Sequence, residues 1–254
     1  MSSDGQCAPG SPRGAGAMVV KTLPMGAGTT FARHAHDDHQ LAWARRGVLT
    51  VHTDAATWVL PPTRALWIPA GVRHVTQASG VATMQTVYLD PERCGRDWTA
   101  PTPVTVGALL AELIAHLGAA ALDGARRARA EAVLIDLLEP LHVATIELRM
   151  PRDPRALDVA AGLAGDPACR RTLEQWGHEV GASERTLARA FLAETGVSFG
   201  RWRTQLRLQA ALPTLAEGGS VASASERAGY ESPSAFVAAF RRETGMTPAE
   251  YFRA

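Results

Sequence analysis

The stretch Ser183–Trp202 is repeated 49 residues later as Ser232–Tyr251, and this internal repeat constrains the chain more than any other feature. The first copy reads SERTLARAFLAETGVSFGRW and the second reads SPSAFVAAFRRETGMTPAEY. Serine, Ala-Phe and Glu-Thr-Gly occur at matching positions. Two similar helical units in tandem predict a surface that contacts a periodic partner twice, and the major groove of duplex DNA returns to the same face about every 34 Å.

Each copy carries the local signals of a helix that follows a tight turn. Ser183 and Ser232 are predicted N-caps, whose hydroxyls accept from the unpaired N–H groups of the first turn. Gly196 and Gly245 are predicted left-handed C-caps. A short apolar stretch at helical spacing, ended by a glycine, precedes each serine. This order is typical of a helix-turn-helix unit, and the alternative is a generic helical domain with a duplicated hairpin.

The C-terminal part of the chain carries several sequence motifs. They are SERTLARAF, ETG and F..WR..LRL around the first repeat copy, and GYESPSAFVAAFRRETGMTP..YFR at the end. With these motifs, residues 169–254 resemble the DNA-binding domain of AraC/XylS-type transcription regulators. The resemblance implies two helix-turn-helix units joined by a long helix over roughly Phe199–Glu217, about 27 Å long. Pro213 departs from the pattern because proline inside a helix costs ~3 kcal/mol. We therefore expect the helix to kink or to end early there.

The two predicted recognition helices differ in the chemistry of their outward residues. The first offers Ser183, Glu184, Arg185, Ala188 and Arg189. The second offers Ser232, Ser234, Ala235, Val237, Ala238, Arg241 and Arg242. Arginine can pair with guanine and glutamate can accept from cytosine, whereas small apolar side chains contact only a thymine methyl. We expect Arg241 and Arg242 to meet phosphates, and the alternative for each arginine is a solvated surface position.

The N-terminal part of the chain has short apolar or alternating runs divided by glycine and proline. The runs are Met18–Leu23, Gln40–Ala44, Val48–Thr53, Thr57–Leu60, Ala65–Ile68 and Met84–Leu89. Many short strands at this spacing predict a small β-barrel or sandwich. The predicted fold class is thus α+β multidomain, with a small β-barrel followed by an all-α double helix-turn-helix domain.

Histidines are the candidate ligands of the predicted barrel. His34 and His36 face the same side if both lie on one strand, Gln40 follows on that side, and His74 lies on a distant strand. We expect His39 to point to the other face, at the surface.

GTTFARHAHDDHQLAWARRG, followed by LPPTRALWIPAGVRHV, resembles the two motifs of cupin barrels. The resemblance implies one metal ion bound by His34, His36 and His74, with Gln40 where cupins carry a glutamate. Three imidazoles suit zinc, nickel, copper or iron(II), but the neutral glutamine would bind the ion less tightly than a carboxylate. The alternative is a metal-free cupin that binds an organic effector with the same side chains.

The expected organisation has five parts. They are a disordered tail at 1–17, a cupin-like sensor domain at 18–100, connector helices within 101–150, a linker and lead-in at 151–168, and the DNA-binding domain at 169–254. The connector helices are predicted at Val104–Gly118 and Gly124–Leu138. Their apolar stripes either pack on the barrel or form a homodimer interface.

Composition narrows the function. The 26 basic and 25 acidic residues leave a net charge of +1, so specific DNA binding must depend on individual arginines rather than on a broad positive field. Cys7, Cys94 and Cys169 are scattered, which suits a reducing cytoplasm. No apolar run approaches the ~20 residues of a membrane span.

We therefore predict a cytoplasmic bacterial transcription regulator, not an enzyme and without catalytic residues. Its partners would be double-stranded DNA, a metal or small-molecule effector, and RNA polymerase if the protein activates transcription. The alternative is a metal-dependent cupin oxygenase or isomerase with an accessory DNA-binding domain. Gln40 argues against that alternative, because turnover chemistry usually depends on the carboxylate at this position.

Overall fold

The computed structural model describes residues 18–54, 56–119, 122–141 and 146–252, so the tail predicted at 1–17 lies outside the described residues. Within them, no helix has the length and apolarity that a membrane crossing requires. The chain divides into two compact units. The first takes in 1–54, 59–145 and 251–254, and the second takes in 55–58 and 146–250.

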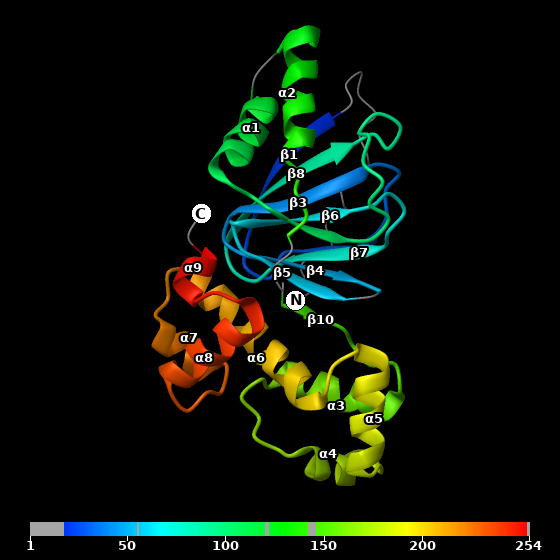
Figure 1. Cartoon of the computed structure of the whole chain (residues 1–254), viewed down its shortest axis with the longest axis vertical. Coiled ribbons are helices and arrows are strands. Elements are labelled where there is room, and N and C mark those ends of the chain that lie inside the picture. The colour runs from blue at the N-terminus through cyan, green and yellow to red at the C-terminus, as the bar shows by residue number, and fades with distance from the viewer. Residues whose placement is uncertain (1–17, 55, 120–121, 142–145, 253–254) are drawn as a thin grey trace. The chain divides into compact units, whose positions relative to one another are not determined.

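The first unit is built from antiparallel strands in two stacked sheets (Figure 1). The strands are β1 (Met18–Met25), β2 (Thr30–His34), β3 (His39–Arg46), β4 (Leu49–Thr53), β5 (Thr57–Leu60), β6 (Arg64–Ile68), β7 (His74–Ala78), β8 (Ala82–Leu89) and β9 (Thr102–Thr105). One sheet has the order β1-β8-β3-β6-β9, and the other contains β5, β4, β7 and β2 in that order. The predicted β domain is confirmed, although β2 and β7, which were expected as the strands that carry the histidines, are not among the predicted apolar runs.

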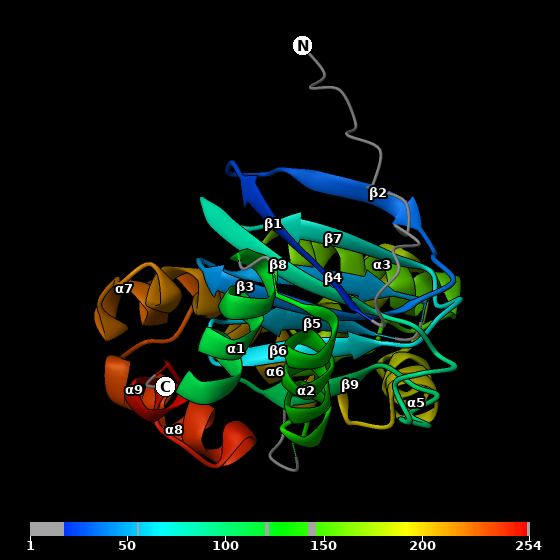
Figure 2. The same cartoon turned by 90° about the horizontal axis from the view of Figure 1, so that it is seen from above.

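Side chains alternate between the two faces of the first sheet. Both faces are buried. Leu41 and Val87 point to one face, where they pack with α1 (Ala108–Ala119) and α2 (Gly124–Asp136). Figures 1 and 2 show these two helices lying over that face. Gln40 points to the opposite face, towards the second sheet, and is also buried. The face of the first sheet that carries Gln40 therefore lines the space between the two sheets.

The first connector helix begins later than predicted. The sequence pattern favoured a helix over Val104–Gly118, but Thr102–Thr105 forms strand β9 against β6, and the helix starts at Ala108. Val104 is fully buried in the core beneath the helices. Its apolar side chain thus belongs to the sheet, which explains why helical periodicity placed the helix start too early.

The second unit is helical apart from β10 (Glu147–Leu148), which pairs with Thr57 and Trp58 of the same unit. Its helices are α3 (Pro154–Gly165), α4 (Leu173–Val180), α5 (Glu184–Thr195), α6 (Phe199–Ala216), α7 (Val221–Arg227) and α8 (Pro233–Thr244), and α9 (Pro248–Phe252) follows them. The pairs α4–α5 and α7–α8 are helix-turn-helix units, and α6 joins them (Figure 1). This confirms the predicted double helix-turn-helix.

Turn chemistry positions both recognition helices, α5 and α8. Ser183 and Ser232 are their N-caps, and each hydroxyl accepts the amide N–H three residues later at 3.2 Å. In the first helix-turn-helix unit, a Cβ on Gly177 would lie 2.4 Å from the carbonyl oxygen of Ala182. Only glycine therefore permits the close approach of α4 to the turn. The angle between the paired helices therefore depends on this glycine.

The Glu-Thr-Gly letters shared by the two repeats end both recognition helices in the same way. Thr195 and Thr244 are buried, and their hydroxyls donate to the carbonyl four residues back, at 2.6 and 2.8 Å. Gly196 and Gly245 follow with φ of 78° and 79°, the left-handed conformation predicted for them. The repeat thus preserves the residues that close the helix, while the outward residues differ.

The segment 151–168 is not a linker, contrary to expectation. It forms α3, which Asp153 caps by accepting N–H groups of the first turn. Val159 and Leu163 are fully buried in the core that α3 shares with α4, α5 and α6. The aspartate before Pro154 is a helix start signal, so the segment belongs to the first helix-turn-helix unit.

Pro213 does not end α6, which continues to Ala216. The N–H of Glu217 donates to the carbonyl of Pro213 at 3.0 Å, so helical hydrogen bonding resumes after the proline. Of the two outcomes expected for this helix, an early end is wrong. The two helix-turn-helix units are thus joined by a helix of 18 residues.

Candidate metal centre and DNA-binding surface

Three histidine side chains converge between the two sheets of the first unit. His34 ends β2, His36 lies in the loop after it, and His74 begins β7 opposite His34. Their ring centroids lie 4.3, 5.2 and 5.9 Å apart, and a nitrogen of each lies within 4.8 Å of the others. The expectation that His34 and His36 share one strand is wrong, because β2 ends at His34. The loop nevertheless brings His36 to the same side.

Each of the three imidazoles has its Nδ1 atom bonded to a backbone carbonyl. The partners of His34, His36 and His74 are the carbonyl oxygens of Ala32, Asp38 and Val72, at 2.8, 2.6 and 3.0 Å. A carbonyl oxygen can only accept, so the proton of each ring is on Nδ1 and the lone pair of a neutral ring is on Nε2. The Nε2 atom of His74 is buried and has no hydrogen-bond partner. Backbone bonds of this kind commonly orient metal-binding histidines.

Gln40 completes the cluster from β3, with only 2% of its surface exposed. Its Oε1 atom lies 3.0 Å from Nε2 of His36, and its Nε2 donates to the hydroxyl of Thr86 at 2.8 Å. Because the His36 proton is on Nδ1, the two facing atoms, Nε2 of His36 and Oε1 of Gln40, are both acceptors. A cation bound to both atoms would stabilise this arrangement. Adjacent ligands of an ion with bonds of about 2.1 Å lie roughly 3.0–3.4 Å apart. The donor set therefore fits a divalent transition metal.

The cluster borders a small, mostly apolar cavity. Its volume is about 10 Å³, and besides His34 and Gln40 it is lined by Leu23, Phe31, Thr76, Met84 and Tyr88. This is the volume of about one water-sized sphere. Burial lowers the pKa of His74 to about 4 and that of His34 below its ordinary value, so both rings are neutral at pH 7. Neutral imidazole is the form that binds metals.

His39 is not the surface residue that we expected. It does point away from the cluster, but its ring packs 4.7 Å from that of Trp67, and its Nδ1 accepts a backbone N–H at 3.0 Å. Its side chain therefore has a structural role on the helix-covered face of the sheet.

Thr86 and Tyr88 contact the cluster and are absent from the predicted site residues. Thr86 holds the Gln40 amide, and the Tyr88 ring stands edge-on to His36 with centroids 5.2 Å apart. Both lie at alternate positions of β8 that follow Met84. The period of two along MQTVYL could have identified them as inward-facing once Met84 was placed in the cavity.

The first recognition helix presents polar residues outward. Leu187 and Phe191 are fully buried on its inner face. The exposed residues are Ser183, Glu184, Arg185, Ala188 and Arg189. All the DNA-contact candidates of the first helix-turn-helix unit are therefore on one accessible face.

The second recognition helix presents a less polar surface. Phe236 and Phe240 are buried, and the exposed residues are Ser234, Ala235, Ala238, Arg241 and Arg242, with Ser232 and Val237 half-buried. A shallow depression of about 510 Å³ lies along this helix, lined by Pro233, Ser234, Val237, Ala238, Arg241 and Thr247. Its lining is largely apolar, with a single cationic side chain, so few groups here can distinguish one base pair from another.

Known proteins share both units of the chain. A family model described as an AraC-like ligand binding domain matches residues 22–138, and one described as a helix-turn-helix domain matches residues 176–254. The HTH-type transcriptional regulator NimR of Escherichia coli (strain K12) is 33% identical over 225 residues, which are 86% of this chain and 81% of that protein. The HTH-type transcriptional activator RhaR of Klebsiella pneumoniae is 25% identical over 244 residues, 87% of each chain. A crystal structure of ToxT from Vibrio cholerae O395 aligns with a TM-score of 0.39 at 12% identity, covering 93% of this chain and 97% of that one.

A β unit that encloses a small ligand cavity, followed by two helix-turn-helix units, defines a DNA-binding transcription regulator with a ligand-binding domain. The identity with NimR extends over most of both chains. The chain therefore belongs to the AraC/XylS family of transcriptional regulators.

Proposed function

We propose that this regulator senses a divalent transition metal through its first unit. His34, His36 and His74 would bind the ion through Nε2, with Gln40 as a neutral fourth ligand. Three backbone-oriented imidazoles, whose protons point away from their common centre, support this most directly. When bound, the ion would supply a +2 charge that cross-links β2, β3 and β7. The proposal is tested by metal analysis of the purified protein, combined with its DNA affinity with and without the ion.

The size of the cavity favours an ion over an organic effector. A cavity of about 10 Å³ admits one small ion or water, whereas pockets for drug-sized organic ligands are roughly 300–1,000 Å³. Phe31, Met84 and Tyr88 line the cavity and restrict it to this size. An organic effector would therefore have to displace these side chains, while an ion would need only the lone pairs already there.

Replacing Gln40 by glutamate is expected to tighten metal binding roughly tenfold or more, because an anionic ligand replaces a neutral one. Competition with a chelator of known affinity measures the change. Gln85→Glu is the matched control, since Gln85 is also buried in the first sheet but points to the opposite face, where it bonds Thr22. Equal metal affinities of Gln40→Glu and the unchanged protein would exclude Gln40 as a ligand.

For DNA binding, we propose that the first recognition helix contacts base edges and that the second mainly contacts the phosphate backbone of the DNA. Arg185 and Arg189 would pair with guanine, and Glu184 would accept from cytosine. On the second helix, Arg241 and Arg242 would contact phosphates, and Val237 with Ala238 would touch thymine methyl groups. The hydroxyls of Ser183, Ser232 and Ser234 would contact the phosphate backbone of the DNA.

The binding site should therefore have two unequal halves. We expect a sharply defined half under the first recognition helix and a degenerate or AT-biased half under the second. Selection of bound duplexes from a random pool, followed by sequencing, measures the information in each half. Two equally informative halves would show that the residues facing the groove have been wrongly assigned.

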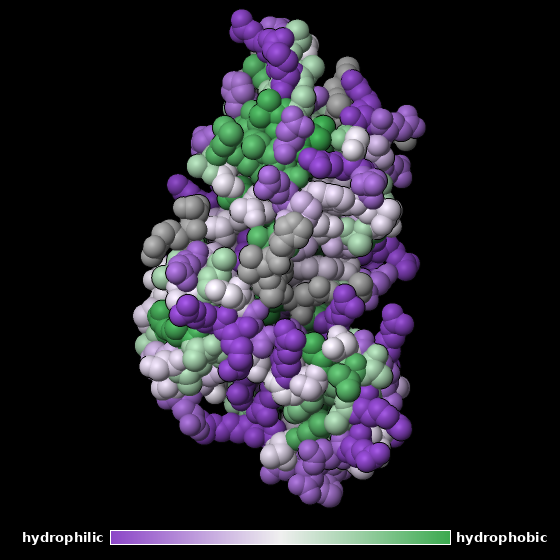
Figure 3. Space-filling view, viewed as in Figure 1, coloured by the Kyte–Doolittle hydropathy of each residue, from purple (hydrophilic) through white to green (hydrophobic). Residues whose placement is uncertain are grey.

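We also propose that the regulator works as a homodimer in the cytoplasm and, if it activates transcription, contacts RNA polymerase. The connector helices support the dimer, since Leu109 on α1 is 65% exposed and Val133 on α2 is 45% exposed. Figure 3 shows apolar side chains gathered over these two helices. Together they offer a face that a second copy could cover.

A further inference from the structure

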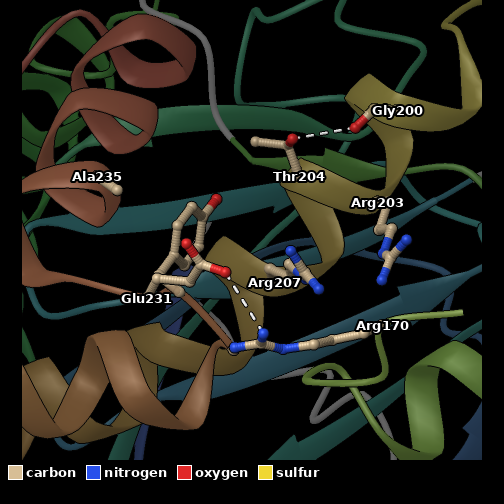
Figure 4. A pocket seen from close by; sticks show the side chains of 9 residues that line it. Arg170, Gly200, Arg203, Thr204, Arg207, Glu231 and Ala235 are labelled. Carbon is tan, nitrogen blue, oxygen red and sulfur yellow. Dashed lines mark hydrogen bonds and ion pairs between the residues drawn. The ribbon is translucent and has the colours of Figure 1, made fainter.

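The second unit contains an arginine-lined pocket that the helix-turn-helix pattern does not account for. It has a volume of about 390 Å³ and lies between the first half of α6 and the turn before α8. Its lining includes Arg170, Arg203, Arg207, Tyr230 and Glu231. Figure 4 shows the guanidinium groups of the three arginines directed into the same space.

Two of these arginines are held in place by the backbone. Arg207 donates from Nε to the carbonyl of Pro167 at 3.0 Å and from Nη2 to that of Cys169 at 3.1 Å. Arg203 donates to the carbonyls of Cys169 and Arg171. Both guanidiniums are therefore positioned before any ligand arrives, so little side-chain entropy remains to be lost on binding.

The pocket carries excess positive charge. Three guanidiniums face a single carboxylate, that of Glu231, which lies 3.3 Å from Arg170 at the exposed edge. Nε of Arg203 is buried and has no hydrogen-bond partner. Burial lowers the pKa of Arg203, and the neighbouring Arg207 guanidinium lowers it further. An anion in the pocket would relieve this repulsion.

The pocket adjoins the face that reads DNA. Ala235 lines it, and the same residue is exposed in the first turn of recognition helix α8, beside Ser234. Arg170 enters from the loop just before α4, the first helix of the other helix-turn-helix unit. The pocket thus lies between the two helix-turn-helix units of the helical unit. If α5 and α8 enter successive major grooves, the intervening phosphate backbone would run between these two helix-turn-helix units.

We propose that the pocket binds one phosphate group of the DNA backbone between the two major-groove contacts. Guanidinium groups match phosphate oxygens in geometry and charge. Glu231 competes with the phosphate for Arg170, so binding requires that ion pair to open. The proposal rests on the DNA binding of the protein and is independent of the metal centre.

Salt dependence of DNA affinity gives the first test, using the full chain. Arg170→Gln removes one exposed guanidinium, and it should reduce the slope of log affinity against log salt by about 0.9. Over a fourfold rise in salt this corresponds to about 3.5-fold in affinity, equal on specific and random duplexes. Glu231→Gln should strengthen binding about threefold, because it removes the competing carboxylate. Arg227→Gln, an exposed arginine at the end of α7, is the control and should change neither quantity.

The source of the phosphate is tested by duplexes with a single neutral methylphosphonate, moved along the backbone between the two half-sites. At one position the unchanged protein should lose affinity, while Arg170→Gln should lose nothing further. Titration with inorganic phosphate in the absence of DNA provides the second arm. If the losses caused by the methylphosphonate and by Arg170→Gln are additive at every position, the proposal is wrong. This holds whether or not free phosphate binds in a manner that depends on Arg170. Specific binding by the unchanged protein shows in the same assay that DNA recognition itself is intact.

Discussion

Replacing His74 by alanine is expected to abolish stoichiometric metal binding. The unchanged protein should carry or take up close to one divalent ion per chain. His74 is 1% exposed, and its Nε2 atom has no partner within the protein, so no other role of this nitrogen competes with ligation. Loss of one of three imidazoles leaves two strong ligands and a neutral amide, which are too few for a stable site. Metal analysis after dialysis against the free ion measures the difference.

His39→Ala is the matched control for this substitution. Its ring is also partly buried in the first sheet, but it packs on Trp67 and faces away from the cluster. His74→Ala should stay folded without metal, because the core under α1 and α2 is apolar and lies on the other face of the sheet. His39→Ala removes one half-buried ring at the edge of that core and should leave the metal content unchanged. A metal-free unchanged protein, or equal metal content in both variants, would favour an organic effector in this cavity.

If the ion is the regulatory signal, its binding and DNA binding must be coupled. The coupling is reciprocal, so the factor by which metal changes DNA affinity equals the factor by which DNA changes metal affinity. Both factors should become one in His74→Ala. Measuring them in both directions distinguishes a sensing site from a structural ion, which would alter stability but not the ratio of DNA affinities.

The helical unit could be predicted from the sequence because its signals are local. Serine caps such as Ser183 and Ser232, and left-handed glycines such as Gly196, act within one turn of the helix that they delimit. The start of α3 carries the same kind of signal in Asp153 and Pro154. The segment was predicted as a linker because these residues lie within Pro151–Ala156, where two prolines in six residues are typical of linkers.

The candidate metal site was only partly predictable. Spacing correctly brought His34, His36 and Gln40 together, but it attributed this to a shared strand, whereas a loop carries His36 to the cluster. The arginine pocket was not predictable, since Arg170 and Arg203 come from segments far apart in the chain. Their proximity follows from the packing of α6 against the loop before α4, which no local pattern reports.

Arg189→Ala is expected to cost about 1–3 kcal/mol on the specific DNA site and to relax the preference at one base pair. Arg189 is exposed on the second turn of α5, on the same face as Arg185, where a bidentate contact to guanine is sterically open. Arg241→Ala is the comparison, because that side chain lies late on α8 and is proposed to meet a phosphate. Anisotropy titrations against the specific site, its single-base variants and random duplex measure both effects.

The two variants should differ in kind as well as in size. A lost base contact lowers affinity for the preferred base pair alone, so all four base pairs at that position become nearly equivalent for Arg189→Ala. A lost phosphate contact lowers affinity on all sequences alike and reduces the salt slope by about 0.9. Neither substitution should unfold the protein, because both side chains are exposed and lie outside the helical core. Equal losses on specific and random DNA for both variants would mean that α5 does not read bases through Arg189.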